Sequence, residues 1–225
     1  MPLPAAPRIT LIHAVQVAMQ PVEQAFRAHW PAAEIVHLLD DSLSPDRARH
    51  ASLSTELHAR INSLADYAVA CGADAILYTC SAFGEAIEAA ARRLTLPVLK
   101  PNESMFEAAL QAGKRIGMLA TFAPSVDSME AEFRALAFEQ QVNAAITTIV
   151  VVDAMAALKV GDAEQHNALL ADAARGLQGC DCILLAHFST SRALAAVQAV
   201  SSCPVLTSPA SAVQKLQRLM ASRVG

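Results

Sequence analysis

Short runs of apolar residues alternate along the chain with longer stretches in which apolar residues recur every three or four positions. The short runs predict strands and the longer stretches predict amphipathic helices. We expect eight strands, at residues 8–13, 34–38, 74–79, 97–99, 115–120, 145–152, 181–186 and 204–206. Helices are expected between them, for example over 21–30, 54–70 and 162–177, with Pro21 in a first turn and Ser54 or Thr55 and Asp162 at helix starts. This alternation favours the α/β class, in which mostly parallel sheets are flanked by helices.

The second half of the chain repeats the first at a constant offset in the numbering, which takes Arg8 to Arg115 and Gly72 to Gly179. Segment 8–28 falls on 115–135, and segment 72–110 falls on 179–217 with ten of 39 positions identical and no gap. Unrelated sequences of this composition would share roughly three or four positions. The central parts of the halves match poorly, which indicates insertions there. We therefore expect two homologous lobes, 1–110 and 111–225, with the C-terminal part of the first lobe able to cross over.

The duplication predicts where a site would lie. Similar lobes normally pack about a pseudo-two-fold axis, so equivalent strand ends meet across one cleft. Ligands of parallel sheets bind at the carboxyl ends of strands, beside helix N-termini. Cys80 follows the strand at 74–79, and the same offset places His187 at the matching point of the second lobe. We expect the active site in the cleft, with Cys80 and His187 on its two sides.

Composition and charge exclude some classes of binding partner. The chain is 54% hydrophobic and 17% charged, with a formal net charge of −4 and no cluster of Lys or Arg. We therefore expect a compact globular protein that binds neither nucleic acid nor anionic membranes. The N-terminal segment MPLPAAPR lacks the apolar core of a signal peptide, and the run AAITTIVVV is about half of a membrane helix. These features predict a cytoplasmic protein.

Cysteine usage gives no framework of disulfides or metal ligands. The chain has five cysteines, an odd number, and they are scattered. Cys180 and Cys182 form a C-x-C on a predicted strand, but no second Cys or His pair lies nearby in the sequence. We interpret both as packing residues and expect no metal.

Three features resemble the aspartate/glutamate/hydantoin racemase superfamily, whose relatives include maleate isomerase and arylmalonate decarboxylase. They are the duplicated lobes, the strand–helix junction TCSAFG (79–84) and the segment GMLATFAPS (117–125). The resemblance covers nearly the whole chain. It implies an enzyme without a cofactor, in which two cysteines face the substrate α-carbon from opposite sides. Cys80 matches the first cysteine, and His187 stands where the second is usual. The resemblance also makes a homo-oligomer plausible.

Hydroxyl groups near the strand ends are candidates for holding a small carboxylate substrate. The resemblance assigns Thr121 and Ser125 to a carboxylate-binding segment, although Ala123-Pro124 replaces the usual Gly-Thr. Thr121 or Ser125 could instead cap the following helix. His13 ends the first strand and could touch substrate, or could face a loop without a role. The expected substrate-binding residues are Thr79, Ser81, Thr121, Ser125, Ser189, Thr190, His13 and Thr207.

The residue types at 80 and 187 suit proton transfer at carbon. A thiol at a helix N-terminus is biased towards thiolate, which can remove a proton or attack an electrophilic alkene or carbonyl. The imidazole of His187 titrates near neutrality and could return a proton, or could lower the pKa of Cys80 through an ion pair. The alternatives are a buried, inert Cys80 and a His187 that only fills the space of a lost cysteine.

We therefore expect a cofactor-independent racemase, epimerase or isomerase of a small carboxylate, such as an acidic amino acid or a hydantoin-like compound. A single-cysteine mechanism could instead serve a decarboxylase or a cis–trans isomerase of a small dicarboxylic acid. A relative that binds ligand without turnover is a further alternative, as is a metal-dependent hydrolase that uses His13, His187 and Asp40. Asp40 could also recognise a substrate amine, whereas Phe83 and Phe188 favour a tight, apolar pocket.

Overall fold

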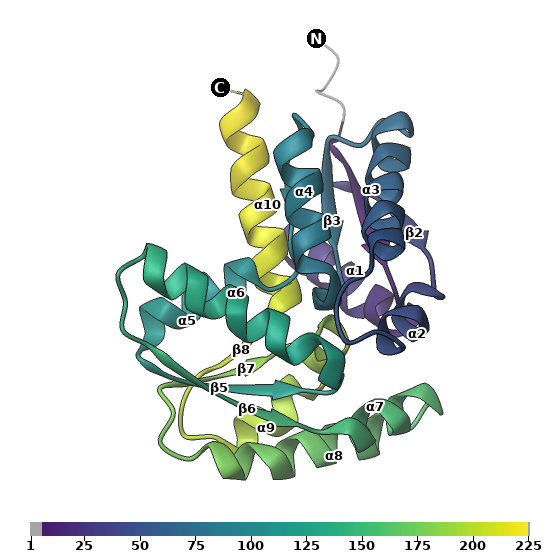
Figure 1. The fold of residues 1–225 in the computed structure, drawn as a ribbon. Coiled ribbons are helices and arrows are strands. Elements are labelled where there is room, and N and C mark those ends of the chain that lie inside the picture. Colours follow the sequence, from purple (N-terminus) through teal and green to yellow (C-terminus); the bar gives the residue numbers. More distant parts are fainter. Residues whose placement is uncertain (1–5, 225) are drawn as a thin grey trace.

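A computed structural model of the chain describes residues 6–224 (Figure 1). Residues 1–5, in the segment that we judged unlike a signal peptide, lie outside the described residues. The strands are β1 (Arg8–His13), β2 (Glu34–Leu39), β3 (Ala75–Tyr78), β4 (Val98–Leu99), β5 (Arg115–Ala120), β6 (Ala145–Val150), β7 (Cys182–Leu185) and β8 (Val205–Thr207). The helices are α1 (Met19–His29), α2 (Leu43–Ala48), α3 (Thr55–Ala70), α4 (Gly84–Arg93), α5 (Glu103–Ala112), α6 (Val126–Glu139), α7 (Val152–Lys159), α8 (Ala163–Ala174), α9 (Leu194–Val200) and α10 (Ser208–Val224). None of these helices is long and apolar enough to cross a membrane.

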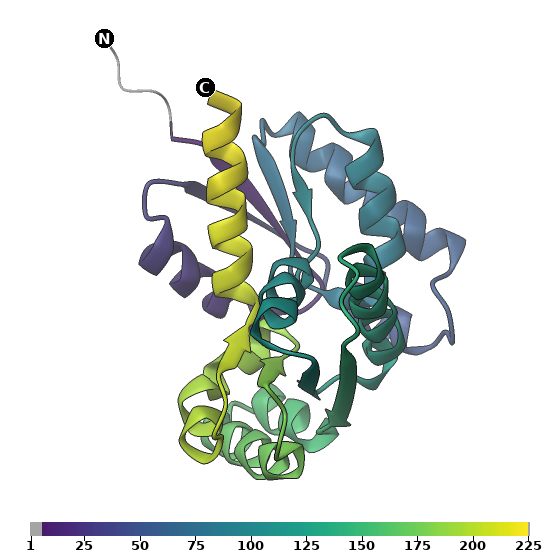
Figure 2. The same ribbon diagram turned by 90° about the vertical axis from the view of Figure 1, so that its left-hand side faces the viewer.

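The strands form two four-stranded sheets with the same topology. The first has the order β2-β1-β3-β4 and the second the order β6-β5-β7-β8, and every strand pair is parallel. Helices flank both sheets, so the predicted α/β class is confirmed (Figures 1 and 2). Strands β1 and β3 map onto β5 and β7 at the offset found in the sequence. That offset would take the start of β2 at Glu34 to Gln141, whereas β6 begins later, at Ala145.

The same hydrogen bond from backbone to aspartate occurs in both halves, at the start of β1 and of β5. The backbone N–H of Arg8 donates to Asp74 Oδ2 at 2.7 Å, and that of Arg115 donates to Asp181 Oδ2 at 2.9 Å. The glycine two positions before each aspartate has a left-handed φ, of 80° and 84°. That conformation suits a residue without Cβ, which explains why both glycines recur in the repeat.

Two predicted elements extend two or three residues too far at their C-terminal ends. We expected a strand over 145–152, but the backbone leaves the extended region at Val151, whose ψ of 74° leads into α7. We expected a helix over 162–177, but α8 ends at Ala174 and a 3₁₀ turn, Arg175–Leu177, follows. The predicted starts of two helices are confirmed, because Ser54 accepts a hydrogen bond from Leu57 N–H and Asp162 accepts one from Gln165 N–H.

The last helix of each half packs against the other half. Met105 and Phe106 of α5 are buried in one cluster with residues of β5 and β7 in the second sheet. Val213 and Leu216 of α10 are buried with residues of β1 and β3 in the first sheet. Figures 1 and 2 show the yellow helix α10 among the purple and blue elements of the first half. The cores of the halves are therefore built from interleaved segments; the lobe boundary at residue 110 stays a prediction.

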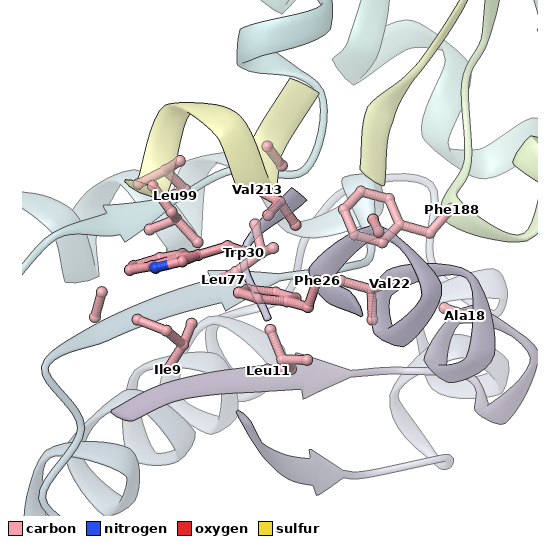
Figure 3. Packing of buried hydrophobic residues seen from close by; sticks show 14 residues of the cluster. Ile9, Leu11, Ala18, Val22, Phe26, Trp30, Leu77, Leu99, Phe188 and Val213 are labelled. Atoms are coloured by element: carbon pink, nitrogen blue, oxygen red, sulfur yellow. The ribbon is translucent and has the colours of Figure 1, made fainter. Parts of the chain in front are cut away.

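Phe188, which follows the end of β7, packs into the core of the opposite half. Its side chain is fully buried in the core cluster of the first sheet. Figure 3 shows it in the same cluster as Val22 and Phe26 of α1 and Val213 of α10. Because Phe188 directly follows His187, its burial fixes where the second half presents that histidine.

Candidate active site

A cavity lies where the carboxyl ends of β3 and β7 meet. The first half lines it with Val15, Ala18, Ser44, Thr79, Cys80 and Ser81. The second half lines it with Phe122, Met155, Lys159, His187, Phe188 and Ser189. The cavity volume of about 50 Å³ is several times the roughly 10–15 Å³ that one water needs on the same measure, so the cavity has room for a few waters or a small ligand.

Cys80 lies between a fully buried strand and a helical turn. The four residues of β3 are buried, and the backbone at Cys80 is extended, with φ −122° and ψ 122°. A 3₁₀ turn, Ser81–Phe83, then leads into α4. Burial raises the pKa of the thiol to about 11, opposed by a hydrogen bond from the Ala82 N–H and by the charge of Arg47. The expected bias towards thiolate is therefore wrong for this structure, because desolvation outweighs the turn's N–H group.

His187 occupies the matching position after β7. Its backbone N–H donates to Thr190 Oγ1 at 3.1 Å, and the Thr190 hydroxyl donates to the His187 carbonyl at 2.6 Å. Thr190 thus holds the backbone of His187 and does not line the cavity. The Nε2 atom of His187 is buried without a hydrogen-bond partner among the described residues. Burial lowers the pKa of this imidazole to about 4, so it is neutral at pH 7.

The predicted hydroxyl groups divide between the cavity and its surroundings. Thr79, Ser81 and Ser189 line the cavity, and Ser81 Oγ is buried without a partner in residues 6–224. Thr121 Oγ1 is also buried without one, but Thr121 does not line this cavity. Unpaired buried hydroxyls cost about 1–3 kcal/mol each, which a ligand that bonds Ser81 would offset.

Ser125 and Thr207 lie outside the lining. Ser125 occupies the position before α6, but its hydroxyl makes no capping bond and donates to the Phe122 carbonyl at 2.8 Å. Thr207 ends β8, half-buried, and its carbonyl accepts a hydrogen bond from the Ser211 hydroxyl at 3.2 Å.

His13 reaches the cavity only through Thr79. Its ring is fully buried, with Nδ1 at 2.8 Å from Thr79 Oγ1 and Nε2 at 2.9 Å from His37 Nδ1. Asp40 is held by Arg60, at 2.6 Å, and does not line the cavity. No Asp or Glu side chain of residues 6–224 lines it, and no three His, Cys, Asp or Glu side chains there are arranged to hold a metal ion.

Arg47 is a buried cation beside Cys80 that the sequence analysis missed. Its side chain is almost fully buried, and it donates from Nε to the Ala82 carbonyl and from Nη2 to the Pro124 carbonyl, both at 3.2 Å. Ala82 belongs to the turn after Cys80, and Pro124 belongs to the second half. Arg47 therefore joins the two halves behind the thiol. In the polar stretch DDSLSPDRARH, nothing distinguishes it from a surface arginine.

Lys159 and Met155 of α7 and Ser44 of α2 were also missed. Helices α2 and α7 follow the second strand of each sheet, where the repeat is not readable in the sequence. Lys159 is exposed and brings the one positive charge among the described residues that line the cavity. A cation at this position can attract an anionic ligand.

The fold and site define a duplicated α/β protein with a cavity between its halves. The protein family described as Asp/Glu/hydantoin racemase matches residues 12–186. The chain therefore belongs to this family, and it is an isomerase by family. The family membership that we inferred from TCSAFG and GMLATFAPS is therefore confirmed.

Solved structures agree on the fold. A glutamate racemase from Bacillus anthracis superposes with a TM-score of 0.77 at 14% identity, over 97% of this chain and 83% of that one. A glutamate racemase from Francisella tularensis in complex with D-glutamate gives 0.76 at 12% identity, over 98% and 83%. An allantoin racemase from Klebsiella pneumoniae gives 0.67 at 15% identity, over 96% and 88%. No curated protein sequence matches the chain significantly.

Proposed function

We propose that this protein is a cofactor-independent racemase or epimerase that moves a proton at the carbon next to a carboxylate or hydantoin-type carbonyl. Cys80 and His187 form its acid–base pair, with His187 in the place of the family's second cysteine. One observation carries the proposal. The two side chains come from matching strand ends of opposite halves and line one cavity, where His187 Nε2 is buried without a partner among the described residues.

The pair holds one transferable proton. With pKa values of about 11 for Cys80 and about 4 for His187, that proton is on sulfur at neutral pH. The His187 imidazole takes the α-proton from one face of the substrate while the thiol gives its proton to the other face. The site is left with an imidazolium and a thiolate, which together process the opposite enantiomer. Environments that push two pKa values apart assign acid and base in this way.

The surrounding groups suit the negative charge that develops on the substrate. Loss of the α-proton places charge on the carbonyl or carboxylate oxygens, where preorganised donors stabilise it. Ser81 and Ser189 supply hydroxyls on the two sides of the cavity, and Lys159 supplies a positive charge at its wall. Arg47 stabilises the thiolate once it forms, because its charge already lowers the pKa of Cys80 against the effect of burial.

The lining favours a substrate without a free ammonium group. No carboxylate of residues 6–224 lines the cavity, so an ammonium would be desolvated without a counter-charge. Its apolar walls include Val15, Phe122, Met155 and Phe188. A hydantoin-like compound, or another 2-substituted acid with a compact apolar substituent, fits these features better than an acidic amino acid does.

The test is α-proton exchange in D₂O, followed by NMR. Wild type, Cys80→Ser and His187→Asn are given amino acids, 5-substituted hydantoins and 2-substituted acids. Cys203→Ser is the matched control, because Cys203 is a half-buried free cysteine outside the cavity. We expect wild type and the control to exchange the α-proton of both enantiomers and to interconvert them, most rapidly for a hydantoin, whereas Cys80→Ser and His187→Asn should each fail to interconvert them. Interconversion of the enantiomers that survives in either variant would contradict the proposal.

A decarboxylase is the second candidate, because a protonated thiol is the group that it needs. Burial keeps Cys80 protonated in this structure. That proton could be delivered to the enediolate left when a 2-substituted malonate loses CO₂. The two activities separate in one assay. A decarboxylase releases CO₂ from malonates in a Cys80-dependent way and needs no proton acceptor, so His187→Asn would keep most of its activity.

A further inference from the structure

Two hydrogen bonds and one longer polar contact run in series from the cavity wall towards the surface. Thr79 Oγ1 lies 2.8 Å from His13 Nδ1, and His13 Nε2 lies 2.9 Å from His37 Nδ1. His37 Nε2 lies 3.5 Å from Glu23 Oε1. The two imidazole rings stack, with centroids 5.1 Å apart. This chain of contacts links the residue after β3 to β1, β2 and α1, with a cavity-lining residue at one end and a surface carboxylate at the other.

The Glu23 carboxylate determines which atom donates and which accepts in each of these hydrogen bonds. Glu23 pairs with Arg27, at 2.8 Å, and the oxygens of a carboxylate can only accept hydrogen bonds. Its charge favours the proton of His37 on Nε2, which leaves His37 Nδ1 as an acceptor. His13 must then donate from Nε2, and its Nδ1 becomes an acceptor in turn. Burial lowers the pKa of both histidines, to about 3 for His13, so each ring carries one N–H at neutral pH.

Thr79 ends the chain as a donor to His13. A hydroxyl has one hydrogen, and the 2.8 Å contact with His13 Nδ1 is far better than the 3.4 Å contact with the Ile12 carbonyl. With that hydrogen committed to His13, the Thr79 oxygen can only accept a further hydrogen bond. The opposite direction would aim the lone pair of His37 Nε2 at the Glu23 carboxylate.

We propose that His13 and His37 are positioning residues that fix the Thr79 hydroxyl as a hydrogen-bond acceptor at the cavity wall beside Cys80. The cavity then selects a ligand that presents an N–H or O–H donor at this point and discriminates against the same ligand with that hydrogen replaced by methyl. The selection of a substrate rests on the proposed function, whereas the direction of the chain does not.

The direction is tested first, on the full-length protein labelled with ¹⁵N-histidine. Long-range ¹H–¹⁵N correlations distinguish a protonated ring nitrogen from an unprotonated one. We expect His13 and His37 both to carry their proton on Nε2. Glu23→Met removes the accepting charge and should shift one or both rings towards the other tautomer, whereas Arg27→Met should leave both unchanged. A wild-type His13 protonated on Nδ1 would overturn the proposal, whatever the protein catalyses.

The selection is tested with 5-benzylhydantoin and its N1-methyl derivative, which lacks the N–H next to the reacting carbon. We expect methylation to weaken binding about tenfold in wild type and in Thr79→Ser, the loss typical of one hydrogen bond. The discrimination should disappear in Thr79→Val, which keeps the shape but not the oxygen. Equal affinities in wild type would overturn the selection. Binding of neither compound would count against the proposed substrate class, and the tautomers would then decide the role of the histidines alone.

Discussion

Replacing Phe188 with alanine should lower both the free energy of unfolding and the activity. This ring packs the end of β7, which presents His187, against the core of the opposite half. The side chain is fully buried in the cluster that contains Phe26 and Val213. Buried Phe→Ala substitutions cost about 3–5 kcal/mol, from the lost transfer free energy and the cavity left behind. With a urea m-value of roughly 2.5 kcal/mol/M, the midpoint of unfolding falls by about 1–2 M.

The assay is urea unfolding followed by the fluorescence of Trp30. Trp30 is the single tryptophan of the chain and belongs to the same cluster as Phe188. Phe138→Ala is the matched control, since Phe138 is 85% exposed and its loss should change the free energy of unfolding by less than about 0.5 kcal/mol. Phe188→Leu should recover part of the loss. A cost below about 1 kcal/mol for Phe188→Ala would refute the inference that this ring anchors the His187 strand end.

Three further predictions concern charges in and around the cavity. The pKa values of His13 and His187, about 3 and about 4, lie below the ordinary 6.5, so in acid only the unfolded chain binds these protons. The free energy of unfolding should therefore fall as the pH drops from about 6.5 to about 4. Calorimetry at both pH values should show that His187→Gln removes about 3 kcal/mol of that fall. An unchanged fall in this variant would contradict the assignment of the low pKa to His187. Arg47→Met should destabilise the fold by about 2–4 kcal/mol and slow the alkylation of Cys80 by iodoacetamide at pH 9. Arg47→Lys should recover part of both. An unaltered alkylation rate in Arg47→Met would count against a role for the charge of Arg47. Lys159→Met should raise KM for an anionic substrate about tenfold with little change in Tm, because this lysine is exposed, and an unchanged KM would exclude it from binding.

Much of the fold could be predicted from the sequence because the strands β1, β3, β5 and β7 are buried on both faces and read as short apolar runs. All eight runs became strands, and the internal repeat correctly paired β1 with β5 and β3 with β7. The end of β6 was not accessible, since the run of apolar residues continues past Val150 while the backbone already turns at Val151. A hydrophobic pattern records burial but not the dihedral angle at which a strand stops.

The cavity was partly accessible for the same reason. The repeat placed Cys80 and His187 at matching strand ends, and both line the cavity. Arg47 and Lys159 come from helices in the unmatched central parts, where no internal comparison could reveal them. The protonated state of Cys80 also escaped prediction, because the depth of burial that raises its pKa depends on packing across both halves.

The most direct test of the Cys80–His187 pair is to follow α-proton exchange in D₂O from each enantiomer of one substrate separately. A two-base site predicts that Cys80→Ser blocks wash-out of the proton from one enantiomer and His187→Asn blocks it from the other, while neither variant interconverts them. Loss of exchange from the same enantiomer in both variants, with the other unaffected, would place both groups on one face. That result would contradict proton transfer between opposite halves of the protein.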